Sequence, residues 1–434
     1  MRDMNILDHY SNLSSTIRST TSNSRLGELQ QAAMQHLLSY GFPTQKHEEW
    51  RYTDLSALSE QPFLAPETAS LTDSDLTLIR SKRLESAVNF VFINGFLDLG
   101  LSDQAPSELE ICSIASAIEN APERIDTYLD QKSSFQDGMD ALAQSSFRDG
   151  LMVRVLKNAQ PERPLHFIHF SGSADRLSSL QHFIVLEEYS SATLIQSFVG
   201  NNCRYLSCSS TNIHAEHAST LQLTNVEQEG SEALHFNTIN VKLDSSSELK
   251  MDLLMIGAKT ARTRLDVRLE AEALFDLNGL FLSGCHRTSD VHTTVNHVGA
   301  HSKSQQKIRG IALDKGRGVF SGKIIVSPGA QKADASMSNQ NLLLSDLAEI
   351  DSKPQLEIHA DDVKCSHGVT VGQLDDEAIF FLQSRGIDRA SAHKLLTFAF
   401  ANRLIEEISQ EELKKQVSKS VTEALSFAEQ NGTR

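Results

Sequence analysis

The sequence predicts a mainly β protein with helical regions at both ends. Its nine prolines leave a gap from residue 165 to residue 327. Because proline cannot donate a hydrogen bond to a sheet, so long a gap is typical of a continuous sheet system. Apolar and polar residues alternate within it, as in 239–243 and 265–269, which indicates strands with one buried face. Near both ends, apolar residues recur every three or four positions instead, which indicates helices.

The N-terminal region is predicted to be mostly helical. Apolar residues have helical spacing at Leu26, Leu29, Ala33, Leu37 and Leu38. Gly41 and Pro43 follow them and end the predicted helix. The only tryptophan, Trp50, stands in the segment 47–53 (HEEWRYT). An amphipathic ring in such a segment is typical of an anchor that packs the terminal region onto the core.

The central region is predicted to be a series of short strands. Apolar runs separated by Ser, Asn and Gly occur at 183–186, 194–198, 221–226, 280–282 and 324–326. These runs show no repeat of fixed length. Periodicity alone therefore leaves two architectures open, a stacked β-solenoid and a large β-sandwich.

The C-terminal region is predicted to contain three helices. A short one covers 375–384, and Asp388 is a good N-cap for the second. The third begins with a predicted capping box, Ser409 with Glu412. Its apolar residues at fourth-residue spacing are Leu413, Val417, Val421 and Leu425. We expect these helices to cover the open end of a solenoid and to dock another protein.

These patterns divide the chain into three parts. We predict a mostly helical region with short strands at 1–149, a β core at 150–372, and a helical region at 373–434. The apolar stripe of the second C-terminal helix includes Leu395, Phe398 and Leu404. If that stripe is partly uncovered, these three side chains are the candidate contacts for a partner protein.

Composition narrows the function classes. The net charge of −16 over 434 residues disfavours nucleic acid as a partner. The start of the chain lacks a secretory pattern and no 18-residue apolar run occurs, so we expect a cytoplasmic protein without a membrane segment. Five cysteines without a C-x-x-C pair predict reduced thiols rather than disulfides.

The strongest local candidate for chemistry is the pair Cys365 and His367. On a strand, positions two apart point to the same face, so a thiolate and an imidazole there could share one soft metal such as iron or zinc. Two ligands do not complete a tetrahedral site, and no neighbouring residues supply the others. By spacing alone, a packed strand pair is favoured over a metal site.

Two further segments are weaker candidates. Five possible ligands, Cys285, His286, His292, His297 and His301, lie close together with Asp290. Their spacing fits no zinc pattern, and alternation sends His292 and His297 to opposite faces of a strand, which favours hydrogen-bonding ladders. A metal-dependent lyase or hydrolase on a β-solenoid, using Asp290, His292 and His297, remains the alternative function. Residues 316–324 (GRGVFSGKI) fail the phosphate-loop template and predict a tight turn between strands.

Longer motifs resemble the SufB/SufD family of iron–sulfur cluster assembly proteins. They are GVFSGKIIV at 318–326, AQKADA at 330–335, NLLLS at 341–345, KPQLEIHADDVKCSHGVTVGQLD at 353–375, SRGI at 384–387, EEWRYT at 48–53 and DVHT at 290–293. The likeness covers most of the chain, although 100–230 contributes little. The chain is most similar to the SufD branch, because Gly368 follows His367 where SufB members usually have an acidic residue.

The resemblance implies a right-handed parallel β-helix flanked by helical ends, which works as a non-catalytic scaffold subunit. It also implies a heterodimer with SufB through the β-helix edge, and a SufC ATPase bound through the C-terminal helices. His367 matches the family's functional histidine at the SufB–SufD interface, and Cys365 matches the neighbouring cysteine. The partner chain would then supply the missing ligands. His359 departs from the family, which commonly has an aromatic residue there.

For cofactors, the resemblance implies none tightly bound to the isolated chain, and iron or a nascent iron–sulfur cluster in the complex. It leaves flavin binding by the complex open. The resemblance also allows the isolated chain to form a homodimer through the same β-helix edge.

Overall fold

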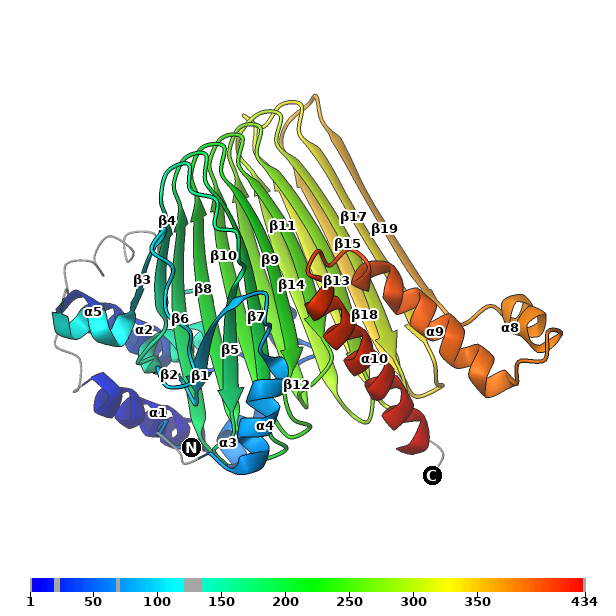
Figure 1. Ribbon diagram of the computed structural model, residues 1–434, viewed down its shortest axis with the longest axis horizontal. Helices are drawn as coiled ribbons and strands as arrows, with labels where there is room; N and C mark the ends of the chain where they lie inside the picture. Colours follow the sequence, from blue (N-terminus) through cyan, green and yellow to red (C-terminus); the bar gives the residue numbers. More distant parts are fainter. Residues whose placement is uncertain (1, 19–23, 68–70, 121–134, 432–434) are drawn as a thin grey trace.

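The computed structural model describes residues 2–18, 24–67, 71–120 and 135–431 and is shown in Figure 1. Its core is two sheets, one of ten strands and one of nine, in the orders β19-β17-β15-β13-β11-β9-β7-β5-β1-β2 and β18-β16-β14-β12-β10-β8-β6-β4-β3. From β4 onward, successive strands enter alternate sheets and pair in parallel. The chain therefore winds as a solenoid, which confirms the predicted parallel β-helix and excludes the sandwich.

The strands have these bounds. The ten-stranded sheet contains β1 (Val88–Ile93), β2 (Phe96–Asp98), β5 (Leu165–Ser171), β7 (Ser191–Gly200), β9 (Thr220–Gln228), β11 (Glu248–Met255), β13 (Leu274–Ser283), β15 (Lys303–Ala312), β17 (Asp334–Leu343) and β19 (Lys364–Gly372). The nine-stranded sheet contains β3 (Leu109–Ser113), β4 (Leu151–Val155), β6 (Leu177–Leu186), β8 (Leu206–Ala215), β10 (Leu234–Leu243), β12 (Thr260–Leu269), β14 (Thr288–His297), β16 (Arg317–Val326) and β18 (Glu349–Ile358). The two sheets thus begin before residue 150, with β1 to β3.

Apolar side chains stack in rows inside the solenoid. Because each turn pairs with the next without a register shift, Val241, Val267, Val295 and Ile324 occupy matching positions on four successive strands of one sheet. All four are buried in one continuous core cluster. Alternation in the sequence therefore has a direct physical cause, since every second residue faces this interior.

The turns between the sheets repeat a backbone conformation rather than a residue type. Residues with φ between 54° and 63° recur at one position in successive turns: Tyr189, Ala218, Ser246, Glu272, His301 and Lys332. This left-handed conformation is uncommon for residues other than glycine. The structural repeat is therefore regular even though the sequence shows none.

Helices of the N-terminal region pack on the outer faces of both sheets. They are α1 (Arg2–Arg18), α2 (Ser24–Tyr40), η1 (Glu48–Trp50), α3 (Ser56–Glu60), α4 (Asp73–Lys82), α5 (Ile114–Asn120) and α7 (Gly138–Ser146). Helices α1, α2 and α7 pack on outward-facing apolar residues of the nine-stranded sheet, including Leu177, Leu206 and Leu234. Trp50 is buried against Phe236 of β10, which confirms its predicted role as an anchor.

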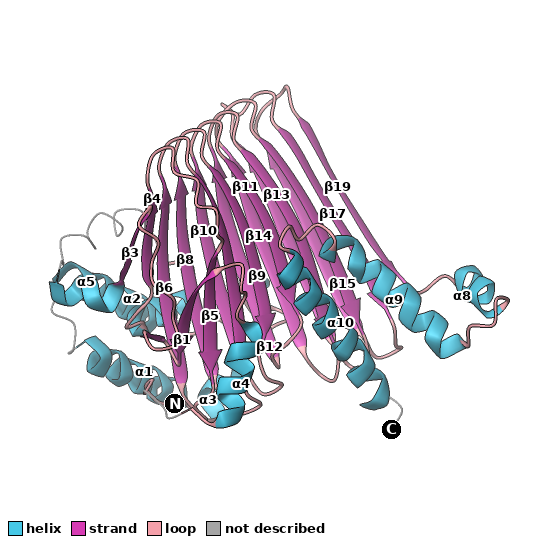
Figure 2. Ribbon diagram, in the orientation of Figure 1, coloured by secondary structure: helices cyan, strands magenta, loops and turns pink. Residues whose placement is uncertain are grey.

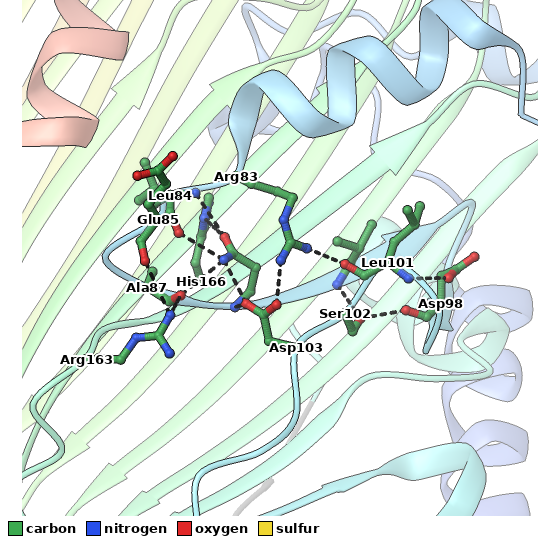
Figure 3. Close-up of polar contacts among 12 residues, drawn as sticks. Arg83, Leu84, Glu85, Ala87, Asp98, Leu101, Ser102, Asp103, Arg163 and His166 are labelled. Carbon is green, nitrogen blue, oxygen red and sulfur yellow. Dashed lines mark hydrogen bonds and ion pairs between the residues drawn. The ribbon is translucent and has the colours of Figure 1, made fainter.

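A polar network joins the segment after α4 to the first solenoid strands, as Figure 3 shows. The Arg83 guanidinium donates to Asp103, whose other carboxylate oxygen accepts from the side-chain amide of Asn89 at 2.9 Å. The Asn89 side-chain oxygen lies 3.1 Å from Nδ1 of His166 on β5. Arg163 donates to the carbonyl of Ala87 from the other side. These contacts satisfy buried polar groups where β1 joins the sheet.

The C-terminal helices are α8 (Asp376–Gln383), α9 (Arg389–Ile405) and α10 (Glu411–Asn431). Asp388 caps α9, as predicted, by accepting from the Ser391 backbone at 2.9 Å. The end of α9 and residues 413–425 of α10 pack on the outer face of the ten-stranded sheet, over which α10 lies in Figure 2. The expectation that they cover the open end of the solenoid is wrong, because their apolar partners lie on the flank.

The predicted capping box of α10 is also wrong. The Ser409 hydroxyl donates to Gln222 of β9, and the Glu412 carboxylate accepts hydrogen bonds from Glu85 and Ser86. Tertiary contacts with the sheet and the N-terminal region thus replace the local ones.

Among the described residues, no helix is long and apolar enough to cross a membrane.

Candidate functional site

The last turn of the solenoid is open. Strands β18 and β19 stand at the ends of their sheets, so each has one backbone edge without a neighbouring strand in the described part of the chain. Pro354 lies in β18, which fits an edge strand because proline lacks the backbone donor. Figure 1 shows β19 at the margin of the solenoid, on the side away from the N-terminal helices. Such an edge is a template for pairing with another chain.

Cys365 and His367 both lie on β19 and share one face. Their register partners on β17 are Ala335 and Met337, which are buried in the solenoid interior. The pair therefore occupies the interior-facing side of the last turn. Cys365 packs partly against the core, whereas His367 is exposed. This confirms the predicted common face and places it at the open end.

The surroundings of Cys365 favour its protonated thiol. Burial raises the pKa of Cys365 above its ordinary value, and the nearby Asp334 carboxylate raises it further. Metals bind the thiolate, so binding at Cys365 would have to displace a proton. The described residues contain no group of three or more His, Cys, Asp or Glu side chains arranged to hold a metal ion. Cys365 and His367 can therefore contribute ligands only to a site that other groups complete.

Apolar side chains surround the pair at the open end. Ile358 is 42% exposed, Val369 is 38% exposed and Val371 is 47% exposed. Alternation places the two valines on the same interior-facing side of β19 as His367, so their exposure comes from the open end. His359 is exposed and directly follows β18. The sequence predicts the alternation of these residues but not their exposure, because nothing in the pattern marks which turn is the last.

The second group of possible ligands does not converge on one site. His297 is buried inside the solenoid, where its two ring nitrogens each lie 2.8 Å from a hydroxyl, of Ser302 and Ser304. His292 faces outward on the same strand and contacts Asp290 at 2.9 Å. Because alternate residues of β14 point to opposite sides, Asp290, His292 and His297 cannot form one metal centre. The structure contradicts the lyase or hydrolase site built on these three residues.

Asp290 instead forms a buried structural cluster with the N-terminal segment. Its carboxylate accepts from the Thr53 hydroxyl and from the guanidinium of Arg262, which lies 3.9 Å above the Trp50 ring. Burial alone would raise the pKa of Asp290, but Arg262 and His292 hold it below its usual range. The cluster fixes the EEWRYT segment to β12 and β14. Sequence reasoning missed Arg262, which carries no local signal.

Residues 316–324 are mostly strand rather than the predicted tight turn. Only Gly316 belongs to a turn, and β16 begins at Arg317. Gly322 faces the interior, where an added Cβ would lie 2.5 Å from Sδ of Met337. The glycines that suggested a turn are therefore explained in part by close packing between successive turns.

The predicted partner-binding residues of α9 differ in exposure. Leu395 is 51% exposed, Phe398 is partly buried, and Leu404 is 7% exposed and packs on the sheet. Sequence reasoning missed Phe380 and Phe381 of α8, which are 72% and 52% exposed. Their signal is present in the sequence as two adjacent aromatic residues on a short helix. The exposed apolar surface therefore lies on α8 and the first half of α9.

Comparisons with known proteins identify the family. Residues 2–167 match the family model described as SufBD protein N-terminal region, and 169–400 match SUF system FeS cluster assembly, SufBD core domain. The iron–sulfur cluster assembly protein SufD of Escherichia coli is 34% identical over 89% of this chain and 90% of its own length. A SufBD family protein of Synechocystis is 29% identical over 90% of this chain and 89% of its own length. SufD of Bacillus subtilis is 24% identical over 64% of this chain and 65% of its own length. This chain belongs to the SufBD family of iron–sulfur cluster assembly proteins.

Proposed function

We propose that this chain is a non-catalytic subunit of a SufBCD complex, where it pairs with SufB, binds the SufC ATPase and supports iron acquisition during cluster assembly. One observation carries the proposal. The open last turn presents Cys365 and His367 beside two strand edges that pair with no other strand of the described residues. Membership of the SufBD family supplies the chemistry for which that arrangement is suited.

In this proposal, His367 supplies a nitrogen ligand and Cys365 a secondary sulfur ligand to iron or a nascent cluster. Imidazole and thiolate both suit iron, and side chains of SufB complete the coordination. Cys365 is secondary because its partial burial and the Asp334 carboxylate raise the pKa of its thiol and so disfavour the thiolate form. The unpaired edges of β18 and β19 provide backbone donors and acceptors for strands of SufB. In the isolated chain, the same edges would serve a homodimer.

Charges placed on the open face are expected to weaken pairing with SufB. Val369→Asp and Val371→Asp put carboxylates on exposed positions of β19, so folding is preserved while an apolar contact is lost. We expect the dissociation constant of the heterodimer to rise about tenfold or more for the double variant, measured by calorimetry with purified SufB. Leu99→Asp, at an 81% exposed position after β2, is the matched control. Equal affinity of wild type and the β19 variant would refute the assigned interface.

We further propose that SufC docks on the exposed apolar surface of α8 and α9, formed by Phe380, Phe381 and Leu395. Phe380 and Phe381 belong to α8, which stands apart from α10 and the sheet in Figure 1, and Leu395 belongs to the first half of α9. Exposed aromatic residues are characteristic anchors of protein interfaces. Leu404 is excluded from this surface because it already packs on the sheet.

We expect a triple variant, with serine in place of Phe380, Phe381 and Leu395, to bind SufC about tenfold more weakly or worse. Its melting temperature should stay near that of wild type, because the replaced side chains are exposed. Co-purification and calorimetry with SufC measure the binding. The matched control is Tyr40→Ser, which removes a 75% exposed aromatic ring at the end of α2. Undiminished SufC binding by the triple variant would show that the docking surface lies elsewhere.

A further inference from the structure

A pocket of about 560 Å³ lies between the N-terminal segment around η1 and the outer face of the nine-stranded sheet. Its volume falls within the range of small-molecule sites. The pocket is distinct from the open last turn, because its floor is the outward side of β12, β14, β16 and β18 rather than the solenoid interior. Nothing in the proposed assembly role uses it.

Four outward side chains form one row across the floor of the pocket. Arg264, His292, Ser321 and Lys353 are register partners on β12, β14, β16 and β18. Neighbouring strands lie about 4.8 Å apart, so the four side chains stand next to one another. A guanidinium, an imidazole and an ammonium group thus flank a single hydroxyl. The row itself contains no carboxylate, although Arg264 pairs with Asp266 at 2.8 Å, His292 contacts Asp290 at 2.9 Å and Lys353 pairs with Glu48.

The carboxylates that line the pocket are more exposed than its two buried arginines. Arg262 and Arg264 are 4% and 16% exposed, whereas Asp351, Glu357 and Glu48 are 28%, 49% and 78% exposed. Buried charges act more strongly on a bound ligand than exposed ones, which water screens. Five lysine or arginine side chains and four carboxylates line the pocket, so its lining favours anions slightly, although the chain as a whole carries a net charge of −16.

One floor donor lacks a partner. Nη1 of Arg262 donates to Asp290 and to the carbonyl of Glu49, but Nη2 is buried without a hydrogen-bond partner among the described residues. An unpaired buried donor is costly, and a guanidinium edge matches the oxygens of a carboxylate or phosphate. Arg262 is held in place by Asp290 and Trp50, so this edge is preorganised.

We propose that this pocket binds a small molecule through an oxyanion group, a carboxylate or a phosphate, seated over Ser321 between Arg264, His292 and Lys353. The bound oxygens would accept from the hydroxyl, from Arg264 and Lys353, and from Nη2 of Arg262. Because the EEWRYT segment forms the other wall, binding would also tighten the N-terminal segment on the solenoid.

The test is calorimetric titration of the full chain at low salt with two probes, inorganic phosphate and malonate. We expect one saturable site for at least one of them, and the probe that saturates identifies the group. Ser321→Asp places a carboxylate in the middle of the row and should weaken binding about tenfold or more. Lys353→Met should weaken it less, because its ammonium also pairs with Glu48.

The matched control is Ser338→Asp, which adds the same charge to an exposed serine on the outer face of the other sheet. This variant should bind like wild type. The proposal is overturned if neither probe saturates, or if Ser321→Asp and Ser338→Asp bind as tightly as wild type. The pairing with SufB does not enter this experiment, so its outcome is independent of the assembly role.

Discussion

Lowering the pH from 7 to 5 is expected to reduce the free energy of unfolding by about 2 kcal/mol for each of four buried histidines. Burial lowers the pKa of His166 and His182 to about 3 and that of His297 to about 4, and it lowers the pKa of His169 well below the ordinary value. The unfolded chain binds protons at these rings near pH 6.5, whereas the folded chain does not. Stability therefore falls as the pH drops below 6.5.

Other buried groups act in the opposite direction. Burial raises the pKa of Glu227 to about 7, so the folded chain binds that proton more tightly than the unfolded one. Burial alone would lower the pKa of His235, but the Glu229 carboxylate 2.6 Å away raises it. Both groups contribute fully to the free energy of unfolding at low pH, and that contribution is lost as the pH rises. Glu227 alone offsets about one histidine, and Asp252, whose pKa burial raises to about 6, and His235 offset more, so the net loss between pH 7 and 5 is smaller than the sum over the four histidines.

The variant His169→Phe isolates one of these histidines. His169 stacks between Phe92 and Phe198, and both of its ring nitrogens are buried without a hydrogen-bond partner in the described part of the chain. The free energy of unfolding of the variant minus that of wild type should be about 2 kcal/mol larger at pH 5 than at pH 7, measured from urea unfolding midpoints. His301→Phe, at an exposed histidine, is the matched control. A flat stability profile of wild type between pH 5 and 7 would contradict the account of these buried rings.

Arg262→Ala is expected to lower the free energy of unfolding by about 3–5 kcal/mol, because it leaves the carboxylate of Asp290 buried without its cation. The variant also loses the contact between the guanidinium and Trp50. Since Asp290 has a lowered pKa in the folded chain, its contribution is present above the unfolded value of 3.8 and is lost as the pH falls below it.

Two variants test that interpretation of Arg262. Arg268→Ala removes a 52% exposed arginine of the same strand, paired with Glu270, and should cost less than about 1 kcal/mol. The double variant Arg262→Ala with Asp290→Ala removes both buried charges and should recover part of the loss. If Arg262→Ala is no more destabilising than Arg268→Ala in urea unfolding, the buried pair does not hold the N-terminal segment.

The strand periodicity could be predicted from the sequence because one face of each strand is buried throughout the solenoid. The same periodicity is sufficient to predict that Cys365 and His367 share a face. The choice between solenoid and sandwich could not be made that way, because the repeat lies in backbone conformation at the turns. Tyr189, Ala218 and Ser246 share a positive φ but no side-chain chemistry. Family motifs were needed to decide.

Tertiary contacts account for the other differences. Ser409 and Glu412 have the spacing of a capping box, but both find partners on distant strands and loops. Leu404 has the same helical pattern as Leu395, yet one packs on the sheet and the other is exposed. A helical stripe specifies which residues face inward only when the position of the helix on the core is known.

Iron per assembled complex is the measurement that tests the proposed assembly role most directly. The complex of this chain with SufB and SufC is reconstituted with wild type, His367→Ala and His301→Ala, and iron is counted per complex. We expect His367→Ala to assemble normally, because its side chain is exposed, but to hold less iron. His301→Ala, which removes an exposed histidine from a solenoid turn, should match wild type. Normal iron content and cluster maturation in the His367→Ala complex would contradict the account.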